Sequence, residues 1–204
     1  MKKNSLTIIG AGGHGKVCLE TALRMKKWDS FSFLDDRKDI RDVLGYPIIG
    51  DTSDFSKIEG DVFVAIGDNA VRISILKSLI ESEMNIISLI DPNAVVSQFA
   101  SIAKGCVIVA GAIVNAAATL GMGTIVNTNA VVDHDCNLGD CVHVCPGATV
   151  CGANVIGDRV WVGTGAVIIQ GQSICSDVVI GANSTIVAAI ASPGVYVGTP
   201  VRKL

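Results

Sequence analysis

The sequence lacks the features that mark several common classes of protein. Its formal net charge of −3 gives no reason to expect a nucleic acid or an anionic membrane surface as a partner. Met1-Lys2-Lys3 is followed at once by a short apolar strand, which is not the pattern of a signal peptide. We therefore expect a cytoplasmic protein that does not associate with membranes.

The seven cysteines contain no CxxC pair. Their odd number argues against a complete disulfide framework, and the missing CxxC spacing argues against a zinc site. We expect reduced cysteines that pack in an apolar interior and no bound metal, with metal binding as the weaker alternative. They are Cys18, Cys106, Cys136, Cys141, Cys145, Cys151 and Cys175.

No charged residue occurs between Lys104 and Asp133, so a hydropathy scan would report a candidate membrane span. We reject that interpretation because the segment carries Gly111, Asn115 and Asn127, and a helix in contact with lipid tolerates such amides poorly. The absence of charge needs another explanation, which the spacing of the aliphatic residues supplies.

From Ile90 to Ile186, every sixth residue is Ile, Val or Leu. An α-helix repeats every 3.6 residues and a strand every two, so a repeat of six requires a coil whose own shape repeats. The positions are Ile90, Val96, Ile102, Ile108, Val114, Leu120, Val126, Val132, Leu138, Val144, Val150, Ile156, Val162, Ile168, Ile174, Ile180 and Ile186. This pattern predicts a left-handed parallel β-helix over residues 90–204, with three hexapeptides in each triangular turn.

A second inward position lies four residues after each aliphatic residue. It holds Ala, Ser, Thr, Cys or Val except at Asn154, Gln172 and Ile190, as the narrow interior of such a prism requires. Successive turns therefore stack residues of one type into ladders.

Residues 1–89 have a different pattern and predict a separate Rossmann-like half domain. An apolar strand at residues 6–9 leads into Gly10-Ala11-Gly12-Gly13-His14-Gly15 and then an amphipathic helix over residues 16–26. A second strand at residues 31–34 ends in Asp35-Asp36, where a Rossmann-type fold places its ribose-binding acid.

The remaining N-terminal elements are a strand over residues 62–66, a helix over residues 71–82 and a strand over residues 86–90. About four strands make only half of a dinucleotide-binding fold, so we expect a site for one nucleotide or nucleotide-sugar. The alternative is that the glycines form a tight structural turn with no ligand. We expect His14 to lie near a diphosphate or a sugar hydroxyl.

Two of the three histidines, His134 and His143, fall within the β-helix. Asp133 and Asp135 flank His134, so a carboxylate is available to fix its tautomer, as a general base requires. The alternative is a solvated polar turn. With 18 residues in each turn, His134 stacks under Gly152, and His143 stacks under Trp161.

His134 and His143 are half a turn out of phase, so we do not expect them to touch within one chain. They converge if neighbouring prisms pack side by side with parallel axes. We therefore predict a homotrimer whose active sites lie between protomers.

The chain resembles a known family, the hexapeptide-repeat sugar acetyltransferases. That group includes sialic acid O-acetyltransferases and the 4-amino-sugar N-acetyltransferases of bacillosamine and perosamine synthesis. The resemblance covers essentially the whole chain and is carried by residues 10–15, Asp35-Asp36, residues 65–69, residues 132–136, residues 142–144 and Val195-Tyr196-Val197-Gly198-Thr199-Pro200.

The resemblance implies an acetyl-CoA-dependent N-acetyltransferase that acts on the 4-amino group of a nucleotide-linked 4-amino-4,6-dideoxy sugar. A UDP-linked sugar is favoured, and dTDP or GDP is possible. It makes His134 the general base, Asp135 its modulator and His143 an acetyl-CoA contact. It places Gly13, His14, Gly15, Asp35, Asp36 and Gly67 at the nucleotide-sugar.

Three glycines, Gly152, Gly163 and Gly181, are further candidate acetyl-CoA contacts, with a plain turn requirement of the coil as the alternative. Two other functions stay open. One is O-acetylation of sialic acid, and the other is a non-catalytic scaffold that binds a nucleotide-sugar.

Overall fold

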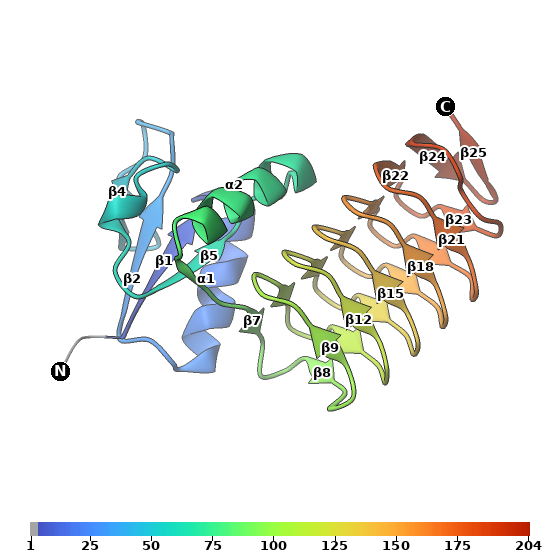
Figure 1. Ribbon diagram of the computed structural model, residues 1–204, viewed down its shortest axis with the longest axis horizontal. Coiled ribbons are helices and arrows are strands. Elements are labelled where there is room, and N and C mark those ends of the chain that lie inside the picture. The colour runs from blue at the N-terminus through green and yellow to red at the C-terminus, as the bar shows by residue number, and fades with distance from the viewer. Residues whose placement is uncertain (1–3) are drawn as a thin grey trace.

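The computed structural model describes residues 4–204. Met1-Lys2-Lys3, on which the expectation about a signal peptide depends, lies outside that range. Figure 1 shows an N-terminal sheet with two helices beside an elongated coil of short strands that runs to the C-terminus. The predicted fold class, a Rossmann-like half domain followed by a left-handed parallel β-helix, is confirmed.

The N-terminal sheet has six strands in the order β3-β4-β2-β1-β5-β6. Strands β1, β2, β5 and β6 pair in parallel, as expected for strand-helix-strand units. The elements are β1 (Ser5–Ile9), α1 (Gly13–Met25), β2 (Ser30–Leu34), β3 (Asp42–Val43), β4 (Tyr46–Gly50), a 3-10 turn (Phe55–Lys57), β5 (Asp61–Val64), α2 (Asn69–Glu81) and β6 (Asn85–Ile86).

Our expectation of about four strands was too low, because the β3–β4 hairpin was not anticipated. Pro47 lies inside β4 and weakens the sequence signal of a strand, since proline is confined to edges of sheets. The strand expected over residues 86–90 is divided between β6 and β7 (Leu89–Ile90), which belongs to the coil. Helix α1 begins three residues before the expected start and so includes part of the glycine-rich loop.

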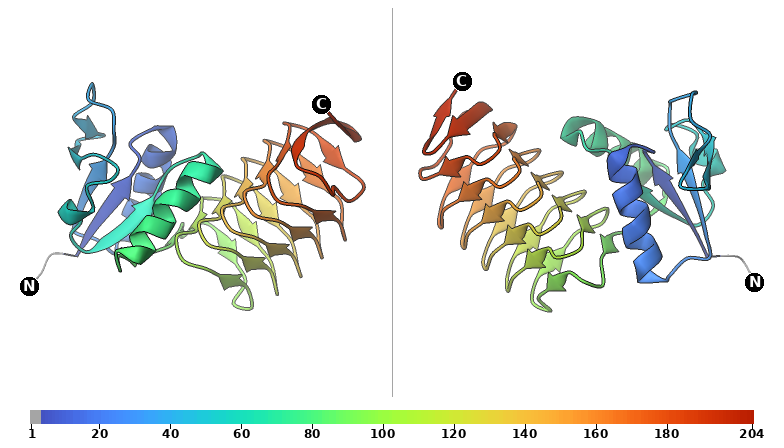
Figure 2. Two further views of the ribbon diagram at one scale, coloured as in Figure 1. Left: turned by 45° about the horizontal axis from the view of Figure 1, so that its top comes forward. Right: turned by 180° about the vertical axis from the view of Figure 1, so that it is seen from behind.

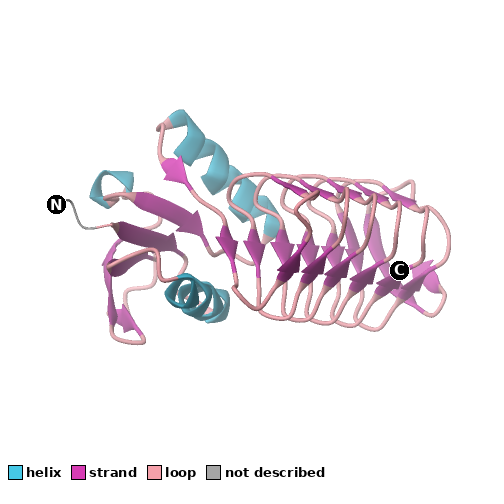
Figure 3. Cartoon of the chain, turned by 90° about the horizontal axis from the view of Figure 1, so that it is seen from below, coloured by secondary structure: helices cyan, strands magenta, loops and turns pink. Residues whose placement is uncertain are grey.

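The coil has three sheets, which are parallel except for the antiparallel pairing of the last two strands of the chain, and each turn supplies one strand to each sheet. Ile125 pairs with His143, so one turn takes 143 − 125 = 18 residues, as predicted. Figure 3 shows the strands stacked in ladders along the coil.

The eight-stranded sheet contains β7, β10 (Val107–Ile108), β13 (Ile125–Val126), β16 (His143–Val144), β19 (Trp161–Val162), β22 (Val178–Ile180), β24 (Gly194–Gly198) and β25 (Val201–Lys203). The six-stranded sheet contains β8 (Val95–Val96), β11 (Ile113–Val114), β14 (Val131–Val132), β17 (Thr149–Val150), β20 (Val167–Ile168) and β23 (Thr185–Ile186). The five-stranded sheet contains β9 (Ser101–Ile102), β12 (Thr119–Leu120), β15 (Asn137–Leu138), β18 (Val155–Ile156) and β21 (Ser173–Ile174).

The coil interior is the apolar ladder that the six-residue repeat predicts. The aliphatic positions from Ile108 to Ile186 are buried, together with the small residues between them. Asn154 is the polar exception and is fully buried. Its amide donates to the carbonyls of Cys151 and Ile169 and accepts from the backbone N–H of Gln172, so the buried polar group is satisfied.

The uncharged segment between Lys104 and Asp133 forms short strands and turns of this coil. Across residues 4–204, no helix has both the length and the apolar character that crossing a membrane requires.

Helix α2 packs along one corner of the coil, between the five-stranded and eight-stranded sheets (Figure 1). One helical turn rises about 5.4 Å and neighbouring strands lie about 4.8 Å apart, so each turn of the helix meets about one turn of the coil. Leu76 is fully buried there. A Cβ at Gly123 would lie 2.4 Å from its Cδ1, and one at Gly105 would lie 3.0 Å from its Cδ2. Glycine at these corners therefore lets the helix approach the coil closely.

Helix α1 contacts the first strand of the coil, and the right-hand view of Figure 2 shows this helix in blue beside the start of the coil. Leu89, Val107 and Ile125 point outward from the coil and share a buried apolar cluster with the N-terminal domain. Arg24 of α1 also forms an ion pair of 2.6 Å with the buried Asp91 at the start of the coil. The N-terminal domain therefore packs against the coil, and it covers the first three strands of the eight-stranded sheet, β7, β10 and β13.

Candidate active site

The first group of candidate residues is the turn that follows β14. The Asp135 carboxylate lies 2.7 Å from His134 Nδ1, and the backbone N–H of His134 donates to Asp133 Oδ1. Asp133 also accepts from the Asn115 side chain, one turn below. A carboxylate only accepts hydrogen bonds, so Nδ1 carries the proton and Nε2 keeps a free lone pair.

This arrangement raises the pKa of His134 above its usual value. The hydrogen bond to Asp135 is the main cause, and the charge of Asp133 adds to it. The imidazole is exposed. The predicted stacking on Gly152 is confirmed, because a Cβ there would lie 2.6 Å from His134 Nε2. Glycine at this position leaves the Nε2 side of the ring open.

The glycine-rich loop joins β1 to α1. A Cβ at Gly15 would lie 2.1 Å from the Gly10 carbonyl oxygen, so Gly15 is required for the close packing of helix on strand. Gly13 at the helix start and Gly67 after β5 have open space on the side where a Cβ would be. The first turn of a helix presents backbone N–H groups that favour anions, so this open side suits a phosphate.

The two acids after β2 both have partners within the protein. Asp35 accepts from the backbone N–H of Ala11 and from Arg37, and these contacts lower its pKa against the opposing effect of burial. Asp36 accepts from the backbone and hydroxyl of Thr52. Asp35 therefore ties the glycine-rich loop to the end of β2.

His14 and His143 meet at the junction of the two domains. Their ring centroids are 6.2 Å apart, and His143 also packs edge-on against Trp161 at 4.4 Å. The backbone N–H of Thr128 donates to Asn127 Oδ1, so the Asn127 amide N–H faces His143 Nε2, at 3.1 Å. His143 therefore carries its proton on its other ring nitrogen, the buried Nδ1.

Both histidines are held in the neutral form. Burial is the main cause, and it lowers the pKa of His14 to about 4 and that of His143 to about 3. The positive charge of Arg72 lowers both values further.

The structure brings some of the predicted residues together and separates others. His14, predicted for the nucleotide-sugar, and His143, predicted for acetyl-CoA, face each other. His134, Asp135 and Gly152 form a second group, at the corner between the six-stranded and five-stranded sheets.

Gly163 and Gly181 lie at another corner, after β19 and β22. A Cβ at Gly163 would lie 2.5 Å from the Ile180 carbonyl oxygen, and one at Gly181 would lie 2.8 Å from a methyl group of Val197. The packing of the coil alone explains both glycines.

A cavity of about 330 Å³ lies between the start of α2 and the outer face of the coil. Its lining residues are Asp68, Asn69, Ala70, Arg159, Trp161, Asp177 and Val179. The sequence analysis did not assign these residues to a site. Trp161, one turn above His143 on an outer face, was the available signal. Within residues 4–204, no cluster of three or more His, Cys, Asp or Glu side chains is placed to hold a metal ion.

Comparison with known proteins identifies relatives of both parts of the chain. Residues 5–79 match the family model of the PglD N-terminal domain. The UDP-N-acetylbacillosamine N-acetyltransferase of Bacillus subtilis (strain 168) is 35% identical over an alignment of 115 residues that covers 52% of this chain. The match spans about half of the Bacillus enzyme, at 51% of its length.

Two solved structures match the fold along almost the whole chain. The acetyltransferase domain of PglB from Neisseria gonorrhoeae FA1090, in complex with acetyl coenzyme A, is 39% identical with a TM-score of 0.96, covering 99% of this chain and 100% of that one. A point mutant of perosamine N-acetyltransferase from Caulobacter crescentus, in complex with CoA and GDP-perosamine, is 32% identical with a TM-score of 0.93, covering 98% and 97%. The chain therefore belongs to the family of hexapeptide-repeat sugar N-acetyltransferases, which confirms the resemblance seen in the sequence.

Proposed function

We propose that this protein transfers an acetyl group from acetyl-CoA to the 4-amino group of a nucleotide-linked 4-amino-4,6-dideoxy sugar. A UDP-linked, bacillosamine-type acceptor is favoured because the Bacillus relative is a UDP-N-acetylbacillosamine N-acetyltransferase. Sugars linked to dTDP or GDP are the other candidates. We place the reaction in the cytoplasm, in the synthesis of a surface glycan or glycoprotein. The observation that carries the proposal is the His134–Asp135 pair with Nε2 free beside Gly152.

In the proposed mechanism His134 is the general base. An ammonium group must lose a proton before it attacks a thioester, and Nε2 of His134 accepts that proton. The amine lone pair then attacks the acetyl carbonyl carbon, and backbone N–H groups stabilise the tetrahedral oxyanion. The carbon–sulfur bond breaks, the nitrogen loses its second proton to solvent as the amide forms, and the imidazolium returns its proton to the leaving thiolate. Asp135 holds the tautomer and stabilises the imidazolium between these two steps.

The candidate contacts to acetyl-CoA differ in their support. Gly152 keeps the space beside His134 Nε2 open, which suits an approaching thioester. His143 is only 5% exposed and packs against His14 and Trp161, so the geometry of this chain gives no support to its contact with acetyl-CoA. Gly163 and Gly181 stay candidates that the coil packing also explains.

The positions of the two groups favour an active site between protomers. The glycine-rich loop lies over the eight-stranded sheet, whereas His134 lies at the corner between the other two sheets. An acceptor held by the loop of one chain therefore meets His134 of a neighbour. The outer face of the six-stranded sheet offers an apolar contact surface for a homotrimer, with Val95 (63% exposed) and the half-buried Ile113, Val131 and Val167.

The test is release of coenzyme A from acetyl-CoA with a panel of UDP-, dTDP- and GDP-linked 4-amino-4,6-dideoxy sugars beside free sialic acid. We expect rapid release with one amino-sugar and a product acetylated on nitrogen. Release with sialic acid alone would favour the O-acetyltransferase. Binding of a nucleotide-sugar without any release would favour the scaffold.

A further inference from the structure

Arg72 is fully buried at the interface between α2 and the coil, and all five of its N–H donors are used. Its acceptors are the carbonyl oxygens of Gly123 (2.8 Å from Nε), Ile66 (2.8 Å from Nη1), Gly67 (3.0 Å from Nη1) and Cys141 (2.9 Å from Nη2), and the side-chain oxygen of Asn69 (2.7 Å from Nη2).

Each of these five acceptors is neutral. A buried guanidinium usually pairs with a carboxylate, and burial here lowers the pKa of Arg72 below its usual value. The guanidinium is tolerated in the interior because four backbone carbonyls and one side-chain oxygen satisfy all of its N–H donors.

The acceptors belong to two different parts of the chain. Ile66 and Gly67 form the loop after β5, which carries a proposed nucleotide-sugar contact, whereas Gly123 and Cys141 lie on successive turns of the coil. Asn69 extends the connection, because its amide donates to the carbonyls of Arg159 and Val160 one turn further on.

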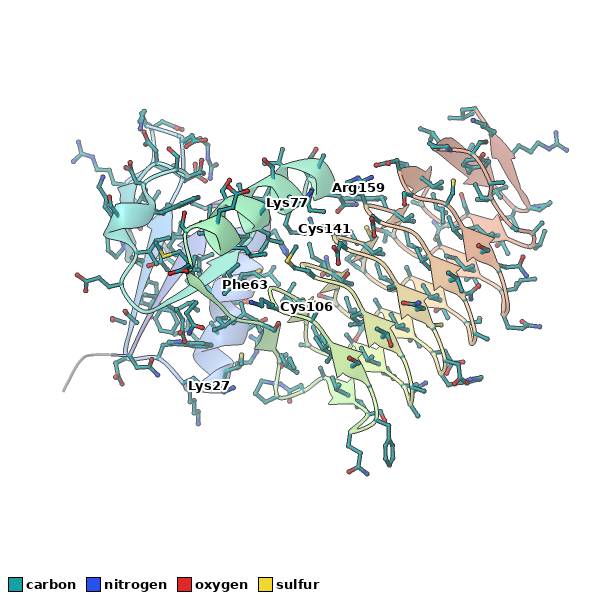
Figure 4. The ribbon with its side chains drawn as sticks, in the orientation of Figure 1. Lys27, Phe63, Lys77, Cys106, Cys141 and Arg159 are labelled. Atoms are coloured by element: carbon teal, nitrogen blue, oxygen red, sulfur yellow. The ribbon has the colours of Figure 1, made fainter. Side chains whose placement is uncertain are left out.

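Figure 4 shows Cys141 and Arg159 on the coil turns beside the start of α2. The same stretch of α2, with Asp68 before it, lines the cavity that also contains Trp161. Any shift of the loop against the coil would therefore change the shape of this cavity.

We propose that Arg72 is a positioning residue, which fixes the Gly67–Asp68 loop against the coil and so places the sugar end of a nucleotide-linked acceptor in the cavity beside Trp161. This inference rests on the proposed function. Arg72 itself is covered by the loop and does not touch the acceptor. Its effect should therefore fall on the acceptor and not on acetyl-CoA.

The experiment compares Arg72→Met and Arg72→Lys with Arg24→Met. Arg24 also joins the N-terminal domain to the coil, through Asp91, but it contacts none of the cavity residues. For Arg72→Met we expect a KM for the nucleotide-sugar raised about tenfold, since several buried acceptors lose their partner, with the KM for acetyl-CoA within about twofold of wild type. Arg72→Lys should recover part of the loss, and Arg24→Met should leave both values near wild type.

An unchanged KM for the nucleotide-sugar in Arg72→Met, or an equal rise in both KM values, would overturn the inference. If Arg72→Met fails to fold, Arg72→Lys decides it by the same two KM values, with thermal unfolding as the check on folding. Failure of the proposed function is distinguishable, because the wild-type protein would then acetylate no amino-sugar in the panel.

Discussion

At the scale of single residues, the strongest feature is the hydrogen bond that sets the tautomer of His134. Its neighbours Asp135 and Asp133 both favour the charged ring, with Asp135 the larger effect. A general base must be neutral to accept a proton, so activity should fall as the pH drops through this raised pKa.

We predict that Asp135→Asn moves the acidic limb of the kcat profile to lower pH and lowers the plateau. The amide removes the main cause of the raised pKa and no longer fixes Nδ1 as the donor. Asp133→Asn is the control and should move the acidic limb less. Oδ2 of Asp133 lies 4.0 Å from Nε2, and its charge contributes less than Asp135 to the raised pKa of His134. A profile that is the same in wild type and Asp135→Asn would contradict the assignment of His134 as the base.

Gly152→Ala should lower kcat by about a hundredfold, the cost of displacing a catalytic group by about 1 Å. The new methyl group would lie 2.6 Å from the His134 imidazole. The double variant with His134→Ala is the control, because the methyl group then has nothing to displace. Steady-state kinetics should show no further loss in the double variant beyond that of His134→Ala alone, and an additive loss would rule out this explanation.

The sequence was sufficient to predict the neighbours of His134. A repeat of fixed length places each residue above the one eighteen positions earlier, so the stacking of Gly152 on His134 follows from numbering alone. The role of Arg72 was not predictable in this way. An arginine in an amphipathic helix ordinarily indicates a solvent-exposed face, and only the docking of α2 on the coil buries it.

At the scale of elements, the regular coil was predictable from the sequence, whereas the short β3–β4 hairpin and the exact start of α1 were not. The six-residue repeat located every turn of the prism, because one inward aliphatic residue per hexapeptide is a strong signal. The β3–β4 hairpin and the early start of α1 depend on local backbone geometry, which the periodicity of hydrophobic residues does not report.

Asn154→Ala should destabilise the coil by about 1–3 kcal/mol, because it leaves buried backbone groups without partners. Asn154 is fully buried and satisfies the carbonyls of Cys151 and Ile169 and the N–H of Gln172. Asn137→Ala, on the exposed face of β15, is the matched control and should change stability by less than about 0.5 kcal/mol. Denaturant unfolding of the two variants would measure the difference, and equal stabilities would contradict it.

At the scale of the whole molecule, the junction of the two domains should be sensitive to acid. The pKa values of His14 and His143 in the folded chain, about 4 and about 3, lie below the usual 6.5. The unfolded chain therefore binds more protons, so the stability these groups contribute is complete above about pH 6.5 and declines as the pH falls towards 4.

We expect the melting temperature to fall between pH 7 and pH 5, and to fall less in a His14→Gln, His143→Gln variant. His134→Gln is the control with the opposite sign, since the raised pKa of His134 gives stability that is lost as the pH rises. Melting temperatures with the same pH dependence in wild type and the double variant would contradict this account of the junction.

The measurement that tests the central claim most directly is complementation between two inactive variants. His134→Ala removes the base, and Gly13→Phe fills the open side of the glycine-rich loop. We predict that each variant alone is inactive and that co-assembled mixed trimers regain coenzyme A release, because one protomer supplies His134 and its neighbour supplies the loop. If the mixture stays inactive while the wild-type protein turns over, the base and the acceptor site belong to one chain and the account is wrong.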